Sequence, residues 1–217
     1  LEELVEEIAD HGVFGAAWAA LRERLSTGGE EIAPVVAPVP DLSDDLLGFF
    51  HDRLKVWLRD HGIRHDVIDA CLAMPGTDDL ALLVTRARAL SDFLKTDDGE
   101  NLLQGFKRAN NILAQAEEKD GVEYSFGADV KFAETEEERA LFSALEAAEA
   151  RIAPAMTAED FGTAMEAMAA LRAPIDAFFE AVQVNAENQV VRRNRLNMLA
   201  SIRKTCLQVA DLTKIEG

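Results

Sequence analysis

The chain has 217 residues, 48% of them hydrophobic, and its 40 acidic and 22 basic residues give a formal net charge of −18. This length suffices for one good-sized hydrophobic core or two small ones. The acidic excess has solubility as its simplest explanation, and it excludes a generally basic nucleic-acid-binding surface, so that nucleic acid could bind only where basic residues gather locally.

The two cysteines, Cys71 and Cys206, are far apart in the sequence and each lies in an apolar helical pattern. We expect buried free thiols, since a disulfide framework or a zinc site would need more or closer cysteines, and this suits a cytoplasmic location. No apolar run approaches the roughly 18 residues that span a membrane. The chain begins at Leu1 in helical rhythm, so we expect a C-terminal piece of a longer protein.

Residues 1–25 have apolar residues at helical spacing and predict two helices, separated near His11 and Gly12. The next stretch, residues 26–40, contains two adjacent glycines and three prolines, which is typical of a linker. The sequence therefore predicts a domain boundary here, with residues 1–40 as the tail of a preceding domain and residues 41–217 as the main domain.

Three helices are predicted between residues 41 and 94. Asp41 or Ser43 caps the first and Gly62 ends it, a shorter helix follows, and Thr77 caps the third. The apolar residues that recur on the first helix are Leu46, Leu47, Phe50, Leu54, Trp57 and Leu58.

A further helix follows the turn at residues 96–99 and has two distinct sides. The residues expected to be buried are Leu102, Phe106, Ala109 and Leu113. A polar stripe on the other side consists of Gln104, Lys107 and Asn111, flanked by Arg108 and Gln115.

Residues 120–134 are predicted to be irregular, with Tyr124, Phe126 and Phe132 available to anchor the loop or to stack on a ligand. Thr135 and Glu138 have the spacing of a capping box, which starts a helix to about residue 153. Two shorter stretches come next: Thr157 is the expected cap of one helix, and Pro174 either kinks that helix or starts another.

The last stretch, residues 190–217, predicts a long closing helix with a wide apolar stripe and a cationic polar side. The stripe contains Val191, Met198, Leu199, Ile202, Cys206, Val209 and Ala210. The opposite side contains Arg193, Asn197 and Lys204, with Arg192 and Arg203 together on one flank. No stretch shows sustained alternation, so the sequence predicts an all-α bundle of about eight to ten helices.

The cationic side of this closing helix has two possible explanations. It could bind an anionic ligand, or its arginines could pair with the acidic helices of residues 134–180. That stretch contains eleven acidic residues and only three basic ones. Arg195 is a separate case, because it falls inside the apolar stripe and is expected to be buried and paired.

Two His-Asp dipeptides, at residues 51–52 and 65–66, resemble the ligand pairs of HD-type metal-dependent phosphohydrolases. The chain has only four histidines, and we expect helix-end and surface histidines here rather than a metal site. No phosphate-binding loop, nucleophile elbow or Cys/His pair at catalytic spacing is present, so no catalytic residue and no cofactor are predicted.

Three segments resemble the C-terminal region of the β subunits of bacterial heterotetrameric glycyl-tRNA synthetases. They read FFHDRLKVWLRDHGIRHDVIDACLA, TDDGENLLQGFKRANNIL and RRNRLNMLASIRKTCLQVADLTKIEG. The resemblance covers about residues 42–217. It implies a DALR-type helical anticodon-binding domain over about residues 93–217, in which Arg195, Leu196 and Leu199 match the R-L-x-x-L pattern of the closing helix.

The resemblance also implies a function. The parent enzyme ligates glycine to tRNA(Gly) with ATP in protein biosynthesis; its catalytic site lies in the separate α subunit, so this chain is expected to be non-catalytic. Expected partners are tRNA(Gly), the α subunit and the remainder of the β subunit, with no membrane. A subunit-docking module without RNA contact is the alternative, and an HD-type hydrolase is a more distant one.

Glycine anticodons share two cytidines, and single-stranded bases are read by stacking and by hydrogen bonds to their edges. Arginine, lysine, asparagine and glutamine side chains can provide such bonds. The predicted tRNA-binding residues are therefore Gln104, Lys107, Arg108, Asn111, Arg192, Arg193, Asn197, Arg203 and Lys204.

Overall fold

The structure, a computed structural model, describes residues 42–216. The predicted helices of residues 1–25 and the linker of residues 26–40 lie outside the described residues. The division of the chain at residue 40 therefore stays a prediction.

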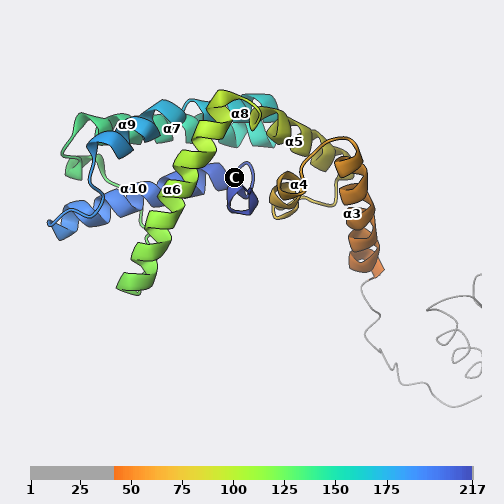
Figure 1. Cartoon of the computed structure of the whole chain (residues 1–217), viewed down its shortest axis with the longest axis horizontal. Coiled ribbons are helices and arrows are strands. Elements are labelled where there is room, and N and C mark those ends of the chain that lie inside the picture. The colour runs from red at the N-terminus through yellow and green to blue at the C-terminus, as the bar shows by residue number, and fades with distance from the viewer. Residues whose placement is uncertain (1–41, 217) are drawn as a thin grey trace, which may run out of the picture. The chain divides into compact units, whose positions relative to one another are not determined.

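The described residues form eight α-helices and two 3₁₀-helices, and they contain no strand (Figure 1). The elements in chain order are α3 (Leu42–Asp60), α4 (His65–Leu72), α5 (Leu80–Phe93), α6 (Asp97–Asp120), η1 (Val130–Phe132), α7 (Glu136–Thr157), α8 (Phe161–Ala169), α9 (Arg172–Ala181), α10 (Gln189–Leu207) and η2 (Leu212–Lys214). The all-α prediction is confirmed for this part of the chain. None of these helices is long and apolar enough to cross a membrane.

Side-chain caps start most of these helices, and the structure corrects two predicted ones. Thr135 and Glu138 form the predicted capping box of α7. The cap of α5 is Asp79 rather than Thr77, and the cap of α8 is Asp160 rather than Thr157. In both corrections an aspartate lies nearer to the first helical residue and accepts a backbone N–H in the first turn, which satisfies a donor that the helix itself leaves unpaired.

The buried apolar residues form one core that extends from Leu58 of α3 to Ile215 after η2. In Figure 1, α6 crosses α10, while α7 packs against α8, α9 and α10. The apolar stripe predicted for the closing helix is buried, as expected, and so is the predicted inner side of α6. Gly105 allows α6 to approach α9 closely, because a Cβ atom at this position would lie only 2.8 Å from Cγ2 of Ile175.

Helix α3 differs from the others because most of its large apolar side chains are exposed. It lies at one end of the described part of the chain, beside α4 and α5 (Figure 1). The exposed residues are Leu46, Phe49, Phe50, Val56 and Trp57. Only Leu58 is fully buried among the described side chains of this helix. The apolar periodicity thus predicted the helix, but its apolar side is not covered by residues 42–216.

Candidate functional site

Helix α6 presents the predicted polar stripe away from the core. Gln104 and Asn111 are exposed, and Lys107 is half-buried. The guanidinium of Arg108 lies 4.4 Å from the centre of the Phe179 ring of α9, a cation–π distance. The four residues therefore lie in the middle of α6, and Arg108 contacts α9.

Two arginines of the closing helix, Arg192 and Arg203, are held by the C-terminal end of α6. Arg203 donates to both oxygens of Glu117, at 3.0 and 3.1 Å. Arg192 lies 2.8 Å from a carboxylate oxygen of Asp120. Arg192 and Arg203 are therefore both paired with carboxylates. These partners lie in α6 and not in the acidic helices of residues 134–180.

The pKa values of these carboxylates follow from the pairing. Burial raises the pKa of Glu117, but the hydrogen bonds from Arg203 and from the Tyr124 backbone outweigh this, so the pKa lies below its ordinary value. Hydrogen bonds from Tyr124 and Arg192 lower the pKa of Asp120. Both carboxylates are therefore charged at neutral pH and neutralise the arginines beside them.

Arg195 is buried and paired, as predicted. Its guanidinium donates to Glu138 at 2.7 Å, to Glu134 at 3.0 Å and to the backbone oxygen of Gln183 at 3.0 Å. Glu138 is itself fully buried. This arginine joins the start of α7 to α10, and its contacts give it a structural role.

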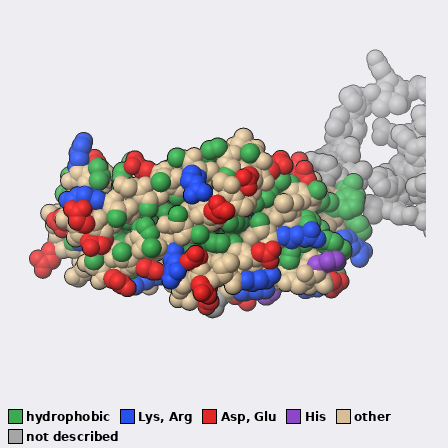
Figure 2. Space-filling view, turned by 90° about the horizontal axis from the view of Figure 1, so that it is seen from above, with side chains coloured by type: hydrophobic (Ala, Val, Ile, Leu, Met, Phe, Trp, Pro, Cys, Tyr) green, Lys and Arg blue, Asp and Glu red, His purple; other side chains and the backbone are tan. Residues whose placement is uncertain are grey.

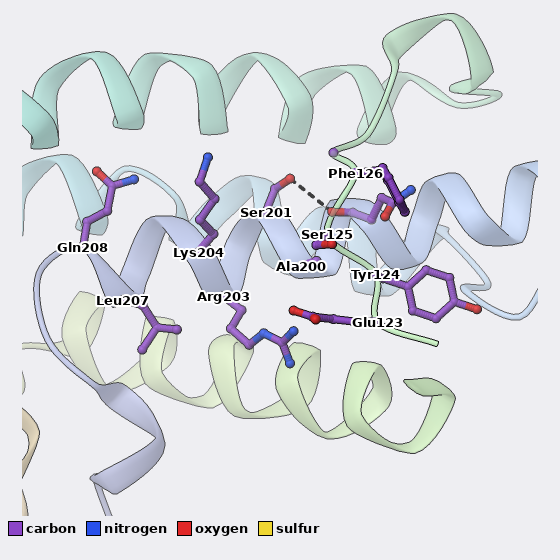
Figure 3. Close-up of a pocket in the computed structure, with 12 residues that line it drawn as sticks. Glu123, Tyr124, Ser125, Phe126, Ala200, Ser201, Arg203, Lys204, Leu207 and Gln208 are labelled. Atoms are coloured by element: carbon purple, nitrogen blue, oxygen red, sulfur yellow. Dashed lines mark hydrogen bonds between the residues drawn. The ribbon is translucent and has the colours of Figure 1, made fainter. Parts of the chain in front are cut away.

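The structure corrects the predicted position of Asn197. The helical wheel placed this residue outward with Arg193 and Lys204, but only 7% of its surface is exposed. The reason is the loop between α6 and α7, which contains residues 121–135 and lies along this side of α10 (Figure 3). A wheel of one helix cannot include a segment that covers it from elsewhere in the chain.

Hydrogen bonds fix this loop to α6 and to α10. The Tyr124 backbone N–H donates to Glu117 at 3.2 Å, and the Tyr124 hydroxyl donates to Asp120 at 2.6 Å. Further along, the Asp129 backbone N–H donates to the Asn194 side chain at 2.8 Å. The segment Ser125–Gly127 lies between these anchors and projects from them.

Phe126 is at the tip of the projecting segment, and 86% of its surface is exposed. Gly127 follows it with φ of 83°, a left-handed conformation that favours glycine. A turn of this kind presents an aromatic ring to solvent instead of returning it to the core. Phe132, also in this loop, is less exposed and does not line the neighbouring cavity.

A cavity of about 470 Å³ lies between this loop and α10, a volume within the usual range for small-ligand sites (Figure 3). It is lined by Glu123, Tyr124, Ser125, Phe126 and Gly127 of the loop and by Asn197, Ala200, Ser201, Arg203, Lys204, Leu207 and Gln208. We call this site the loop–α10 pocket. It combines an aromatic ring with carboxylate, amide, hydroxyl and ammonium groups, so it can both stack on and hydrogen-bond to a flat polar ligand.

Charged side chains border the loop–α10 pocket on opposite sides. Arg203 points toward α6, and Lys204 points toward α7 (Figure 3). The ammonium of Lys204 is 3.4 Å from Glu149, and most of the lysine side chain is exposed. Arg193, nearer the start of α10, is exposed as well.

The nine predicted site residues do not form one cluster. Asn197, Arg203 and Lys204 line the loop–α10 pocket, whereas Arg108 contacts α9. Helix α6 meets Arg203 at Glu117, nine residues beyond Arg108, which corresponds to about 14 Å along the helix. The α6 stripe is therefore a separate polar surface.

Sequence reasoning missed several lining residues, of which Glu123, Ser125, Ser201 and Gln208 carry polar groups. Phe126 was named as an aromatic residue available for stacking, but it was not placed in the site. An exposed phenylalanine followed by glycine in a loop was the available signal. The fold alone shows which helix that loop covers.

The two His-Asp pairs have ordinary contacts. His51 donates to the backbone oxygen of Thr77 at 2.7 Å. Asp66 accepts hydrogen bonds from Arg64 and from the Glu216 backbone N–H. Within residues 42–216, no group of three or more histidine, cysteine, aspartate or glutamate side chains could hold a metal ion. His11 lies outside the described residues.

The helical arrangement, with a long closing helix across α6 and α7, defines a helical domain, and comparison identifies its family. A family profile described as the DALR anticodon binding domain matches residues 102–216, more than half of the chain. The chain belongs to this family. The match includes most of α6, the loop and α10, and therefore the entire loop–α10 pocket.

Several curated relatives of this chain are described as the glycine–tRNA ligase beta subunit. The chain is 70% identical to that of Dinoroseobacter shibae over 201 residues, which is 93% of this chain and 28% of the relative. It is 81% identical to that of Cereibacter sphaeroides over 173 residues, or 80% of this chain and 25% of the relative. It is 50% identical to that of Rhodospirillum centenum over 191 residues, which is 88% of this chain and 27% of the relative.

These comparisons confirm the resemblance found in the sequence. The chain spans about a quarter of the length of the curated relatives it matches.

Proposed function

We propose that this chain is the tRNA recognition module of a glycine–tRNA ligase beta subunit and that it contacts the anticodon. The proposal is supported by the match to the DALR anticodon binding domain and by the description shared by the relatives. The whole ligase would join glycine to tRNA(Gly) with ATP in the cytoplasm. The chain itself would have no catalytic residue and no cofactor, and its protein partners would be the α subunit and the remainder of the β subunit.

The single observation that carries this proposal is the loop–α10 pocket. An exposed aromatic ring stands beside amide and hydroxyl groups where the α6–α7 loop lies along α10. Single-stranded RNA is recognised by this combination, because an unstacked base offers both a π face and polar edges. A pocket of this kind suits a base that projects from a tRNA loop.

The charge distribution of the described residues is consistent with local RNA binding. Figure 2 shows acidic and basic side chains mixed on one face of the molecule, without a broad basic patch. On α10, however, Arg193 and Lys204 are exposed. Since the chain has a net charge of −18, attraction to phosphates must come from such local groups, and binding should weaken steeply as salt is added.

A direct test is titration of the chain with tRNA(Gly) at two salt concentrations. The matched control is the same tRNA with its anticodon replaced. We expect saturable binding to tRNA(Gly) that weakens with salt, and clearly weaker binding to the control. Equal affinity for both tRNAs, or no binding at low salt, would contradict anticodon recognition.

A docking function remains the second candidate, and the exposed apolar side of α3 favours it. Leu46, Phe49 and Trp57 would be energetically better placed against another protein surface. The α subunit is the partner to test. If Phe49→Ser with Trp57→Ser weakens α-subunit binding but leaves tRNA affinity unchanged, α3 is a docking element within an RNA-binding module. If the chain binds the α subunit and no tRNA, docking is its function.

A further inference from the structure

We propose that the exposed side of α3 is a docking surface for the remainder of the beta subunit, and that the surface covering it is apolar with carboxylates at its border. The inference rests on the proposed place of this chain in a beta subunit, but it does not depend on tRNA binding. We call this side the outer face of α3, and it consists of Leu46, Phe49, Phe50, Arg53, Val56 and Trp57.

Helix α3 carries apolar residues on two sides. On the inner side, Leu54 and Leu58 pack against the core. The apolar residues of the outer face recur at helical spacing and are between 41% and 53% exposed. A helix that covers a core on one side needs only one apolar stripe. The second stripe therefore indicates a partner surface outside residues 42–216.

The fold holds this helix in place. Leu58 is fully buried. The His51 ring donates to the backbone oxygen of Thr77 at 2.7 Å, and the ammonium of Lys55 lies 3.0 Å from Asp69 of α4. A surface that is already ordered loses little conformational freedom when a partner binds. The outer face is therefore prepared for docking.

Two arginines lie over aromatic rings of the outer face. The guanidinium of Arg53 is 4.9 Å from the centre of the Phe49 ring, and that of Arg88 in α5 is 5.6 Å from the centre of the Trp57 ring. Within residues 42–216 neither guanidinium forms an ion pair, although the whole chain has 40 acidic residues. Tryptophan and arginine are among the residue types enriched where protein interfaces bind most strongly. The outer face therefore suits a partner whose carboxylates surround an apolar centre.

The apolar residues favour protein over RNA as the partner. Leu46, Phe50 and Val56 offer no hydrogen bond to a base edge or to a phosphate, which are the groups that RNA presents. A protein surface can remove these side chains from water, and the burial of apolar area is what stabilises such contacts.

The share of the relatives that this chain covers favours the same polypeptide over a separate subunit. The chain spans about a quarter of their length, so in the proposed beta subunit most of the polypeptide is attached to this chain. Covalent attachment raises the effective concentration of a partner surface, and an attached surface needs fewer contacts than a separate protein does. The remainder of the beta subunit is therefore the expected occupant of the outer face.

The test labels side chains with hydroxyl radicals in two proteins, the 217-residue chain and the full-length beta subunit without α subunit or tRNA. Two phenylalanines calibrate the reaction: Phe126 is 86% exposed and Phe106 is 1% exposed. In the 217-residue chain, Phe49 and Phe50 should react at a level closer to Phe126. In the full-length beta subunit we expect their reactivity to fall to the level of Phe106.

Charge reversal tests the chemistry of the partner surface. In the full-length beta subunit, Arg53→Glu combined with Arg88→Glu should return Phe49 and Phe50 to high reactivity, because carboxylates would then face carboxylates. The matched control is Arg59→Glu, an exposed arginine on another side of α3, which should leave both residues protected. In the 217-residue chain these variants should melt like the wild type, since all three positions are exposed. Protection that survives the double reversal overturns the inference.

The α subunit and tRNA(Gly) are the other possible occupants. Protection of Phe49 and Phe50 that appears only after one of them is added to the full-length beta subunit overturns the inference, and so does high reactivity in the complete ligase.

Titration of the 217-residue chain with tRNA(Gly) tests the proposed function separately. If the chain binds tRNA(Gly) while Phe49 and Phe50 stay reactive in the full-length beta subunit, only this inference is wrong. If the chain binds no tRNA and both residues are protected, tRNA recognition by this chain is wrong and the docking surface stands.

Discussion

Arg195 shows how one side chain can hold two helices together. It is buried against Glu138 and Glu134, so its removal would leave a buried carboxylate without its partner. Arg195→Ala should lower the free energy of unfolding by about 3–5 kcal/mol, the usual cost of breaking a buried ion pair from one side. Denaturant titration measures this difference.

The matched control is Arg193→Ala, an exposed arginine two positions away, which should change the stability by less than about 0.5 kcal/mol. Equal stability of the two variants would show that Arg195 contributes no more than a surface residue.

Glu138 gives the same contact a pH dependence. Burial raises its pKa, but hydrogen bonds from Arg195 and from two backbone N–H groups outweigh this, so the pKa lies below the ordinary 4.5. A carboxyl with a lowered folded-state pKa stabilises the fold above the unfolded-state pKa, and this stabilisation is lost as the pH falls through the folded-state value. Wild-type stability should therefore decline as the pH falls below about 4.5.

In Arg195→Ala the sign of this contribution reverses, because the remaining burial raises the pKa of Glu138 and protonation relieves the buried charge. The stability difference between the wild type and the variant should narrow from about pH 7 to about pH 4, as unfolding curves at both values would show. A stability difference that stays constant between about pH 7 and pH 4 would mean that protonation of Glu138 does not contribute to it.

At the scale of the element, the buried faces of α6 and α10 test the assigned core. Phe106, Leu199 and Ile202 are buried at the contact between these helices and the rest of the bundle. Truncation of any one to alanine should cost about 2–5 kcal/mol, the range for large buried side chains. Thermal or denaturant unfolding of the three variants checks this. Wild-type melting temperatures would contradict the packing.

The sequence predicted these two helices well because each carries a regular apolar stripe that its neighbours cover. It also placed Arg195 inside the bundle, since this arginine falls within such a stripe. Asn197 was placed wrongly, because burial by the α6–α7 loop leaves no trace in the periodicity of α10. The loop–α10 pocket arises from two distant segments and could not be assembled from either one alone.

At the scale of the whole molecule, the spacing of apolar residues predicted the all-helical class. It did not predict which acidic residues pair with the basic residues of α10. The sequence left open whether the basic residues of α10 bind a ligand or pair within the bundle. The structure divides them: Arg192, Arg195, Arg203 and Lys204 form ion pairs with α6, with α7 or with the segment just before α7, while Arg193 is exposed. Ion pairing between helices depends on how they cross, which no single helical pattern records.

The exposed groups of α10 provide the measurement that tests tRNA binding most directly: tRNA(Gly) affinity over a series of salt concentrations, for the wild type and for Arg193→Glu combined with Lys204→Glu. Contacts to single-stranded phosphates make log K fall with log salt by about 0.7 per phosphate neutralised. The double reversal should therefore weaken binding and flatten the salt slope by roughly one to two units.

The melting temperature of the double variant must remain close to that of the wild type, because each substitution lies at an exposed position and should cost less than about 0.5 kcal/mol. Weaker binding with a flatter slope is the predicted result. Unchanged affinity and slope in a variant that melts like the wild type would contradict tRNA binding by this surface of α10.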